Sequence, residues 1–233
     1  MLNIVAINQG AKPLTMQAPR PVPLDARAAG AALDRGAVAL DIRAPADFGA
    51  SHLPEALHVP ASSSEFEQRA GWMLPPEGEI FLVAEDERAA QEAAFKLAFV
   101  GLDGRVSGFV TMHDWRAGGL AVSTLPQLSV EELWERRKSE GIGVLDVREP
   151  SEWREGHLEE ASLMSYRQLP ARLAELGWSP DEPVAVICAT GMRSSTASSV
   201  LLRAGFRKVF NVTGGMRAWK QAGFPLTSTP GGR

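Results

Sequence analysis

The sequence contains a single cysteine, Cys188, among its 233 residues. No intrachain disulfide can therefore form, and a chain with so few thiols is typical of a reducing compartment. No stretch approaches the roughly 18 uninterrupted apolar residues that a transmembrane helix needs. Residues 1–10 also lack the basic and apolar regions of a signal peptide. We therefore expect a cytoplasmic protein with no membrane partner.

The sequence also lacks an excess of positive charge. Its 24 Lys and Arg residues stand against 28 Asp and Glu residues, which gives a formal net charge of −4. A nucleic-acid partner is therefore not expected. Hydrophobic residues make up 45% of the chain and charged residues 22%, which is ordinary for a globular protein and excludes a disordered, collagen-like or coiled-coil chain.

One segment of the sequence occurs twice. Residues 41–53 resemble residues 146–158 at an offset of 105, with Asp, Arg, Pro, His and Leu at matched positions. Residues 101–115 and 205–219 each begin with Gly and end with Trp, at an offset of 104. A net deletion of one residue relates the two offsets. The chain therefore contains an internal repeat.

The repeat predicts two domains, at residues 20–122 and 128–227. About 100 residues are enough for one copy to bury its own core. A short polar stretch that contains proline, residues 123–127, separates the copies and suits a linker. Residues 1–20 belong to neither copy.

The second copy alternates predicted strands with predicted helices. Ser129 and Glu132 form a capping-box pattern that begins a helix, and apolar spacing predicts another helix over residues 194–204 that ends at Gly205. Short apolar runs predict three buried strands, over residues 143–147, 184–187 and 208–212. This alternation predicts an α/β fold in which each domain has a mostly parallel sheet with helices on both faces.

Residues 188–194 are the candidate site, because they follow a predicted buried strand and lead directly into a helix. Ligands of α/β sheets bind beyond the carboxyl ends of strands, where helix N-termini present unpaired N–H groups. The helix dipole and Arg193 both favour the thiolate form of Cys188. Gly191 lets the backbone wrap its N–H groups around one atom, and the guanidinium of Arg193 can pair with two anionic oxygens.

For Cys188 and Arg193, a purely structural role is the alternative to a role in chemistry. Cys188 can be a buried structural cysteine, and Arg193 can be paired with a nearby carboxylate. Trp115 and Trp219, which match in the two copies, are most simply core residues.

Other recurring polar residues are interpreted as structural, although Arg148 can also line the pocket. His52 and His157 are expected to hold the loop after a strand through hydrogen bonds, since one of the two copies lacks the cysteine. The Asp–Arg pairs that recur are interpreted as ion pairs that fix a loop: Asp41 with Arg43, and Asp146 with Arg148.

The motifs of the second copy resemble those of rhodanese domains, and the chain is similar to tandem-rhodanese sulfurtransferases. The resemblance rests on the run Cys188-x-x-Gly191-x-Arg193-Ser194 and on residues 146–150, 152–153, 156–158, 214–219 and 222–226. It implies that Cys188 takes a sulfane sulfur from thiosulfate or a persulfide and passes it to a thiol, cyanide or sulfite. It implies no metal and no organic cofactor. The residues implied to bind the substrate are Ala189, Thr190, Gly191, Met192, Arg193, Ser194 and Arg148.

The first copy departs from this family at the decisive position. Ala84 stands where the second copy has Cys188, and the following loop, residues 85–89, contains three carboxylates that would repel an anionic donor. We therefore predict that this copy is catalytically inactive.

Residues 66–76 resemble the pseudo-rhodanese domain of fusions that join a metallo-β-lactamase-fold persulfide dioxygenase to two rhodanese domains. The metal-binding His-x-His-x-Asp-His signature of that dioxygenase is missing from this sequence, whose four histidines are scattered. A separate protein that produces persulfide is therefore a candidate partner.

Two other functions remain open. A phosphatase or arsenate reductase also places a thiolate in an anion-binding loop, but the phosphatase signature has five residues between Cys and Arg, whereas residues 189–192 are four. A persulfide carrier or docking module without turnover is the third hypothesis. Because Arg193 is the one cation of a loop that is otherwise neutral, a persulfide such as glutathione persulfide is as plausible a donor as the thiosulfate dianion.

Overall fold

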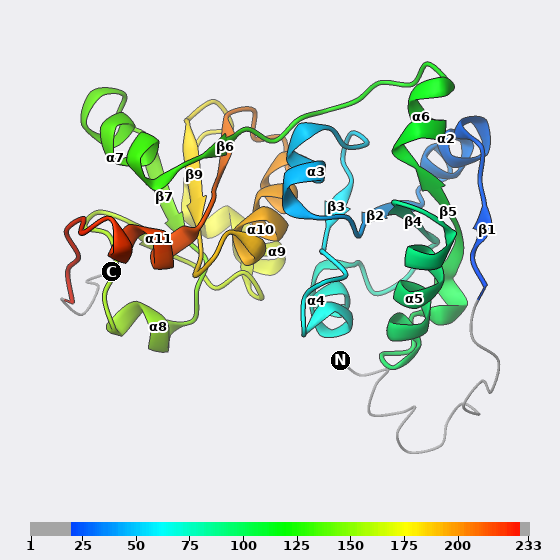
Figure 1. Ribbon diagram of the computed structural model, residues 1–233, viewed down its shortest axis with the longest axis horizontal. Helices are drawn as coiled ribbons and strands as arrows, with labels where there is room; N and C mark the ends of the chain where they lie inside the picture. The colour runs from blue at the N-terminus through cyan, green and yellow to red at the C-terminus, as the bar shows by residue number, and fades with distance from the viewer. Residues whose placement is uncertain (1–19, 229–233) are drawn as a thin grey trace. The chain divides into compact units, whose positions relative to one another are not determined.

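The computed structural model describes residues 20–228, and the chain divides into two compact units between Ser123 and Thr124. Each unit contains a five-stranded sheet flanked by helices (Figure 1). This confirms the predicted α/β class. The division falls at the start of the predicted linker. Residues 1–19, most of the N-terminal segment that belongs to neither repeat, and residues 229–233 lie outside the described range.

The first unit begins with a short strand and ends with a helix. Its elements in chain order are β1 (Val22–Pro23), α2 (Ala26–Asp34), β2 (Val38–Asp41), α3 (Pro45–Ala50), β3 (Leu57–His58), α4 (Phe66–Met73), β4 (Ile80–Ala84), α5 (Glu87–Ala98), the 3-10 helix η1 (Asp103–Arg105), β5 (Val106–Thr111) and α6 (Met112–Ala117).

The second unit has the same order of strands and α-helices, but its 3-10 helix precedes the fourth strand, whereas that of the first unit precedes the fifth strand. Its elements are β6 (Gln127–Leu128), α7 (Val130–Ser139), β7 (Gly143–Asp146), α8 (Pro150–Arg154), β8 (Ser162–Leu163), α9 (Leu169–Arg172), η2 (Leu173–Leu176), β9 (Val184–Ile187), α10 (Met192–Arg203), β10 (Val209–Val212) and α11 (Gly215–Gln221).

The two sheets have equivalent topology. Their strand orders are β1-β5-β4-β2-β3 and β6-β10-β9-β7-β8, and every pairing between these strands is parallel. The register confirms the repeat, because Asp41 pairs with Val83 in the first sheet and Asp146 with Ile187 in the second. In a parallel sheet all carboxyl ends lie at one edge, so the residues that follow β7, β8, β9 and β10 gather there.

The local predictions for the second copy hold with small shifts in their bounds. Ser129 caps α7, and its capping box with Glu132 is complete. Strand β9 has the predicted bounds, while β7 is one residue shorter and β10 begins one residue later than predicted. Helix α10 begins at Met192, two residues before the predicted start, and Gly205 has a φ of +92° directly after its C-cap. The predicted helix stop is therefore confirmed.

The matched tryptophans are core residues, as predicted. Trp115 is 4% exposed and Trp219 is fully buried. Each indole N–H donates to a backbone carbonyl six residues further along the chain, Trp115 to Ala121 at 2.8 Å and Trp219 to Pro225 at 3.0 Å. A buried indole needs such an acceptor, so these bonds also hold the end of each unit against its core.

The recurring histidines are also structural. Nδ1 of His52 lies 2.8 Å from the carbonyl oxygen of Phe48, and Nδ1 of His157 lies 3.0 Å from that of Trp153. Each imidazole stacks on the ring of the same residue. These contacts fix the turn that follows α3 in the first unit and α8 in the second. Within residues 20–228, none of the helices combines the length and the apolar character that a membrane span needs.

Candidate functional site

Cys188 lies in a tight loop between β9 and α10, at the carboxyl edge of the second sheet. The residue is 1% exposed, and its Sγ accepts the N–H of Gly191 at 3.1 Å. Gly191 has a φ of +99°, a conformation that turns its N–H back toward the sulfur and that side chains with a Cβ rarely adopt. Thr190, two residues after the cysteine, is exposed. The sulfur therefore lies beneath the loop and is bound by its backbone.

The first turn of α11 donates hydrogen bonds to the backbone of this loop. The N–H of Met216 donates to the carbonyl of Cys188 at 2.8 Å, and the N–H of Arg217 donates to that of Ala189 at 3.0 Å. In a trans peptide the N–H points opposite to the carbonyl, so the N–H groups of Ala189 and Thr190 point away from α11. Successive N–H groups turned to one side form an anion-binding concavity.

Gly215 makes this approach possible. Its φ is +55°, and a Cβ placed on it would lie 2.3 Å from the carbonyl oxygen of Cys188 and 2.7 Å from the backbone nitrogen of Thr190. No side chain fits there. The residues Gly214-Gly215-Met216 were matched to the family's C-terminal end in the sequence, but their contact with the cysteine loop was not predicted.

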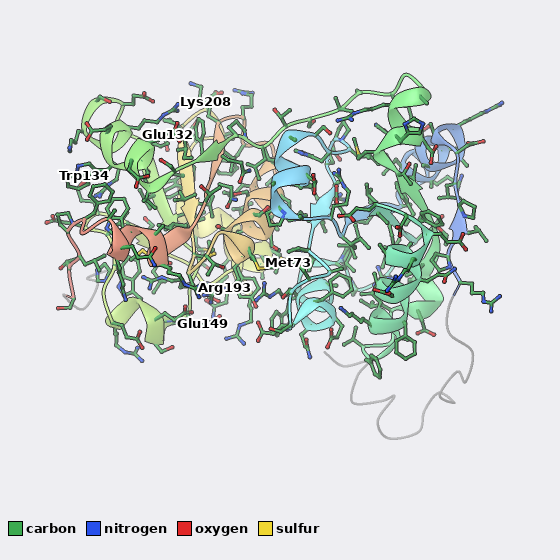
Figure 2. All side chains as sticks on the ribbon, in the orientation of Figure 1. Met73, Glu132, Trp134, Glu149, Arg193 and Lys208 are labelled. Atoms are coloured by element: carbon green, nitrogen blue, oxygen red, sulfur yellow. The ribbon has the colours of Figure 1, made fainter. Side chains whose placement is uncertain are left out.

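Arg193 is paired with Glu152, a pairing that was not predicted from the sequence. Its Nη1 and Nη2 each donate to one oxygen of Glu152 in α8, both at 2.7 Å. This hydrogen-bonded pair raises the pKa of Arg193 and lowers the pKa of Glu152. Figure 2 labels Arg193, near the start of α10, and Glu149, directly before α8.

The structure thus shows the alternative interpretation of Arg193, a pairing with a nearby carboxylate. Its predicted contact with an anionic substrate stays a prediction. In the sequence, Glu152 stood in the repeated segment, where the first copy has Asp47, and in the pair Glu152-Trp153 that resembles a rhodanese motif. A single sequence does not reveal which cation such a carboxylate meets.

Arg148 is engaged in its own motif. Its Nε and Nη2 bind both oxygens of Asp146, at distances from 2.6 to 3.0 Å, and Nη2 also donates to the carbonyl of Gly156 at 2.9 Å. Nη1 donates to the carbonyl of Glu152 at 3.1 Å. The side chain is 4% exposed. These contacts favour the loop-fixing interpretation, and substrate binding by Arg148 stays a prediction.

The rest of the predicted loop divides between surface and interior. Ala189 and Met192 are half-buried. Ser194 is fully buried, and its Oγ donates to the side chain of Asn211 in β10 at 2.6 Å. Asn211 in turn donates to Gln127 in β6 at 2.7 Å. The hydroxyl of Ser194 therefore connects α10 to the sheet, and Asn211 was not predicted from the sequence.

The corresponding loop of the first unit is built differently. Ala84 is the last residue of β4 and pairs with Thr111 of β5, so the strand extends to the position that Cys188 holds in the second unit. Asp86 caps α5, and its carboxylate accepts the N–H of Ala89 at 2.8 Å. The negative charge of Asp86 therefore lies at the helix N-terminus, where an anionic substrate would need to bind.

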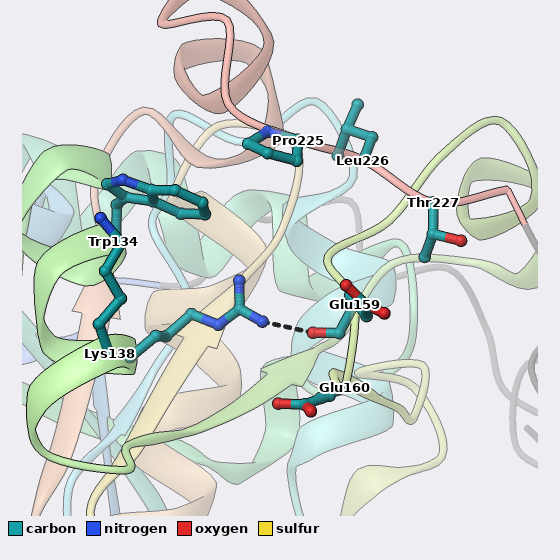
Figure 3. Close-up of a pocket in the computed structure, with 8 residues that line it drawn as sticks. Trp134, Lys138, Glu159, Glu160, Pro225, Leu226 and Thr227 are labelled. Carbon is teal, nitrogen blue, oxygen red and sulfur yellow. Dashed lines mark hydrogen bonds between the residues drawn. The ribbon is translucent and has the colours of Figure 1, made fainter.

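A cavity of about 300 Å³ lies elsewhere in the second unit (Figure 3). It is lined by Trp134, Arg137 and Lys138 of α7, by Glu159 and Glu160 before β8, and by residues 225–227. These segments adjoin the amino ends of β7 and β8, whereas Cys188 follows the carboxyl end of β9. Arg137, one of the lining residues, donates to the carbonyl of Glu159. Within residues 20–228, no group of three or more His, Cys, Asp and Glu side chains is arranged to hold a metal ion.

Comparison with known proteins identifies similar chains. The family model described as a rhodanese-like domain matches residues 129–222. A sulfurtransferase of Allochromatium vinosum is 30% identical over 93 residues, which are 40% of this chain and 85% of that protein. The thiosulfate sulfurtransferase GlpE of Actinobacillus pleuropneumoniae is 29% identical over 103 residues, 44% of this chain and 94% of GlpE.

Two further matches differ in how much of the other protein they cover. The chain spans 62% of the length of YrkF, a Bacillus subtilis protein named as a sulfur carrier, with 32% identity over 117 residues that are 48% of this chain. A rhodanese-related protein of Thermoplasma volcanium has a solved structure with a TM-score of 0.40 and 32% identity. That match covers 44% of this chain and 98% of the Thermoplasma chain.

Proposed function

The chain belongs to the rhodanese-like sulfurtransferase family, and we propose that its second unit transfers a sulfane sulfur through Cys188. The observation that carries the proposal is the hydrogen bond from the N–H of Gly191 to Sγ, at the N-terminus of α10. A thiolate at this place is stabilised by the backbone N–H and by the helix dipole. The relatives named as sulfurtransferases support the same chemistry.

The proposed cycle has two displacement steps. The thiolate of Cys188 attacks the outer sulfur of the donor, and the donor's S–S bond breaks as the new S–S bond forms. Sulfite leaves thiosulfate with the bonding electron pair, or a thiolate leaves a persulfide. The acceptor then attacks the outer sulfur of the Cys188 persulfide and becomes thiocyanate, thiosulfate or a new persulfide. The Cys188 thiolate is released, so sulfur is transferred without an external oxidant or reductant.

The loop backbone has two tasks in this cycle. The N–H of Gly191, which donates to Sγ, and those of Ala189 and Thr190, which point away from α11, stabilise the negative charge of the persulfide under this proposal, as preorganised donors do in other covalent intermediates. The carbonyls of Cys188 and Ala189, bound by α11, keep these N–H groups oriented. Because Cys188 is 1% exposed, a donor reaches Sγ only after neighbouring side chains move.

The first unit has no part in the chemistry under this proposal. Ala84 offers no nucleophile, and the Asp86 carboxylate occupies the helix N-terminus. Its role is then to support the second unit or to dock a partner. The resemblance of residues 66–76 to persulfide dioxygenase fusions makes a persulfide-producing protein the partner to test.

Whole-protein mass spectrometry tests the proposal directly. Incubation with thiosulfate or glutathione persulfide is expected to add one sulfur, about 32 Da, to the protein. The adduct is expected to disappear in Cys188→Ala and to remain in Glu85→Ala, which changes the equivalent loop of the first unit. Thiocyanate formation from cyanide is expected to follow the same pattern.

Three results would contradict the proposal. An adduct that persists in Cys188→Ala would place the sulfur elsewhere. Release of phosphate from an aryl phosphate without sulfur transfer would instead support a phosphatase. An adduct that forms on Cys188 but never turns over would indicate a carrier.

A further inference from the structure

We infer that Glu152 is a positioning residue that also selects the sulfur donor, an inference that rests on the proposed function. By holding Arg193 and offsetting its charge, Glu152 makes the Cys188 loop favour a persulfide over the thiosulfate dianion. The argument has three parts: how Glu152 is held, what it does to the guanidinium, and which charge remains for a donor.

Glu152 is held from three sides. Its two carboxylate oxygens accept the terminal nitrogens of Arg193, each at 2.7 Å. One of these oxygens also accepts the N–H of Glu149 at 3.1 Å, and the carbonyl of Glu152 accepts Nη1 of Arg148 at 3.1 Å. The carboxylate therefore has a fixed position at the start of α8, and it fixes Arg193 in turn.

This pairing occupies the edge of the guanidinium that is formed by its two terminal nitrogens. Both terminal nitrogens of Arg193 point at Glu152, so an oxygen pair of thiosulfate would have to displace the carboxylate to gain the same geometry. The pair is only partly exposed, with 15% of the Arg193 side chain and 31% of the Glu152 side chain accessible. A displaced carboxylate would lose a charged partner in a partly desolvated place, which opposes the exchange.

The remaining charge of the loop decides between donors. Residues 189–192 are neutral, and the positive charge of Arg193 is matched by the negative charge of Glu152. A dianion that approaches the Cys188 thiolate therefore meets no net positive charge. The reacting end of a persulfide carries at most one negative charge, so it is repelled less. The backbone N–H groups of the loop, which can act without the charge of Arg193, then bind the transferred sulfur.

The test compares kcat/KM for thiosulfate with kcat/KM for glutathione persulfide. The unmodified chain is expected to favour the persulfide. Glu152→Gln keeps the shape of the side chain and removes its charge, so the thiosulfate-to-persulfide ratio is expected to rise about tenfold. Glu155→Gln removes the same charge from an exposed residue just after α8, and is expected to change the ratio less than about twofold.

For a second variant, the thiosulfate-to-persulfide ratio of kcat/KM is expected to change in the opposite direction. Arg193→Gln leaves Glu152 without its cation, so the same ratio is expected to fall by about tenfold. A purely structural role for the pair would lower both kcat/KM values in either variant and leave their ratio unchanged. That result would overturn the inference, as would an unmodified chain that prefers thiosulfate.

The mass of the protein separates this inference from the proposed function. If Cys188 of the unmodified chain takes up no sulfur from either donor, the proposed function fails. If the adduct forms in all variants and the donor ratio stays constant, the function stands and the role of Glu152 is refuted.

Discussion

Substitution of Gly215 by alanine is expected to disable the site without changing any residue of the cysteine loop. The new Cβ would lie 2.3 Å from the carbonyl oxygen of Cys188, and 2.7 Å from the carbonyl carbon of Ala189 and the nitrogen of Thr190. All three neighbours are backbone atoms, so none of them can rotate away as a side-chain tip would. Either the loop or the start of α11 has to shift.

The size of the shift follows from ordinary contact distances. Real Cβ atoms essentially never lie closer than 3.0 Å to a neighbouring heavy atom, and ordinary contact begins at 3.4 Å, so the carbonyl of Cys188, 2.3 Å from the new Cβ, has to move by roughly 0.7 to 1.1 Å. A displacement of about 1 Å in a catalytic group typically lowers the rate by a factor of about 100. We expect a loss of this size in kcat/KM for thiocyanate formation.

Gly223 provides the matched control. It follows the end of α11, has a φ of +71°, and a Cβ there would have no atom within 4 Å. Gly223→Ala therefore introduces the same left-handed strain, about 1 to 2 kcal/mol, without a clash. Its kcat/KM is expected to stay within about twofold of the unmodified chain. Thermal unfolding of both variants separates lost stability from lost activity.

Activity is the decisive measurement in this pair. Full kcat/KM in Gly215→Ala would show that the loop does not depend on its contact with α11. An equal loss in Gly223→Ala would show that general destabilisation, and not displacement of the loop, lowers the activity.

Two further predictions concern the first unit. Burial lowers the pKa of His58 from 6.5 to about 3. The unfolded chain therefore takes up the proton first, and stability falls as the pH drops from 6.5 toward 3. Between pH 7 and pH 5 the free energy of unfolding, measured with urea, is expected to fall by about 2 kcal/mol through this group. His58→Leu introduces the residue found at the equivalent position of the second unit, Leu163, and is expected to abolish this contribution. An unchanged pH dependence would refute the assignment to His58. Ala84→Cys is expected to form no sulfur adduct in a chain that also carries Cys188→Ala, because the Asp86 carboxylate caps the helix N-terminus; an adduct on the new cysteine would refute that reasoning.

The sequence predicted those features that depend on residues close together along the chain. The Cys188 loop was recognisable because strand, loop and helix are contiguous, and the ion pair of Asp146 with Arg148 joins residues two positions apart. The parallel sheets followed from alternating strands and helices, since each crossover unit has the same local pattern. Because the two copies could be aligned with each other, the first copy was seen to have Ala84 in place of the cysteine.

Contacts between distant segments were beyond the reach of a single sequence. Glu152 and Arg193 are 41 residues apart, and either could have paired with many other charges. The sequence therefore left open whether Arg193 binds an anionic substrate or a carboxylate of the chain, and did not indicate which carboxylate. The hydrogen bond from Ser194 to Asn211 of β10 likewise joins distant segments and was not predicted, while substrate binding by Ser194 stays a prediction.

Residues close together in the sequence therefore indicated the candidate nucleophile and its loop. The charge and orientation of the candidate site depend instead on the packing of the second unit. A cysteine between a buried strand and a helix is a candidate nucleophile, because a helix N-terminus favours an anion. Whether that cysteine is held beneath its loop, and whether Arg193 is available to a donor, depends on α8 and α11. These helices reach the loop only when the parallel strands bring their carboxyl ends to one edge.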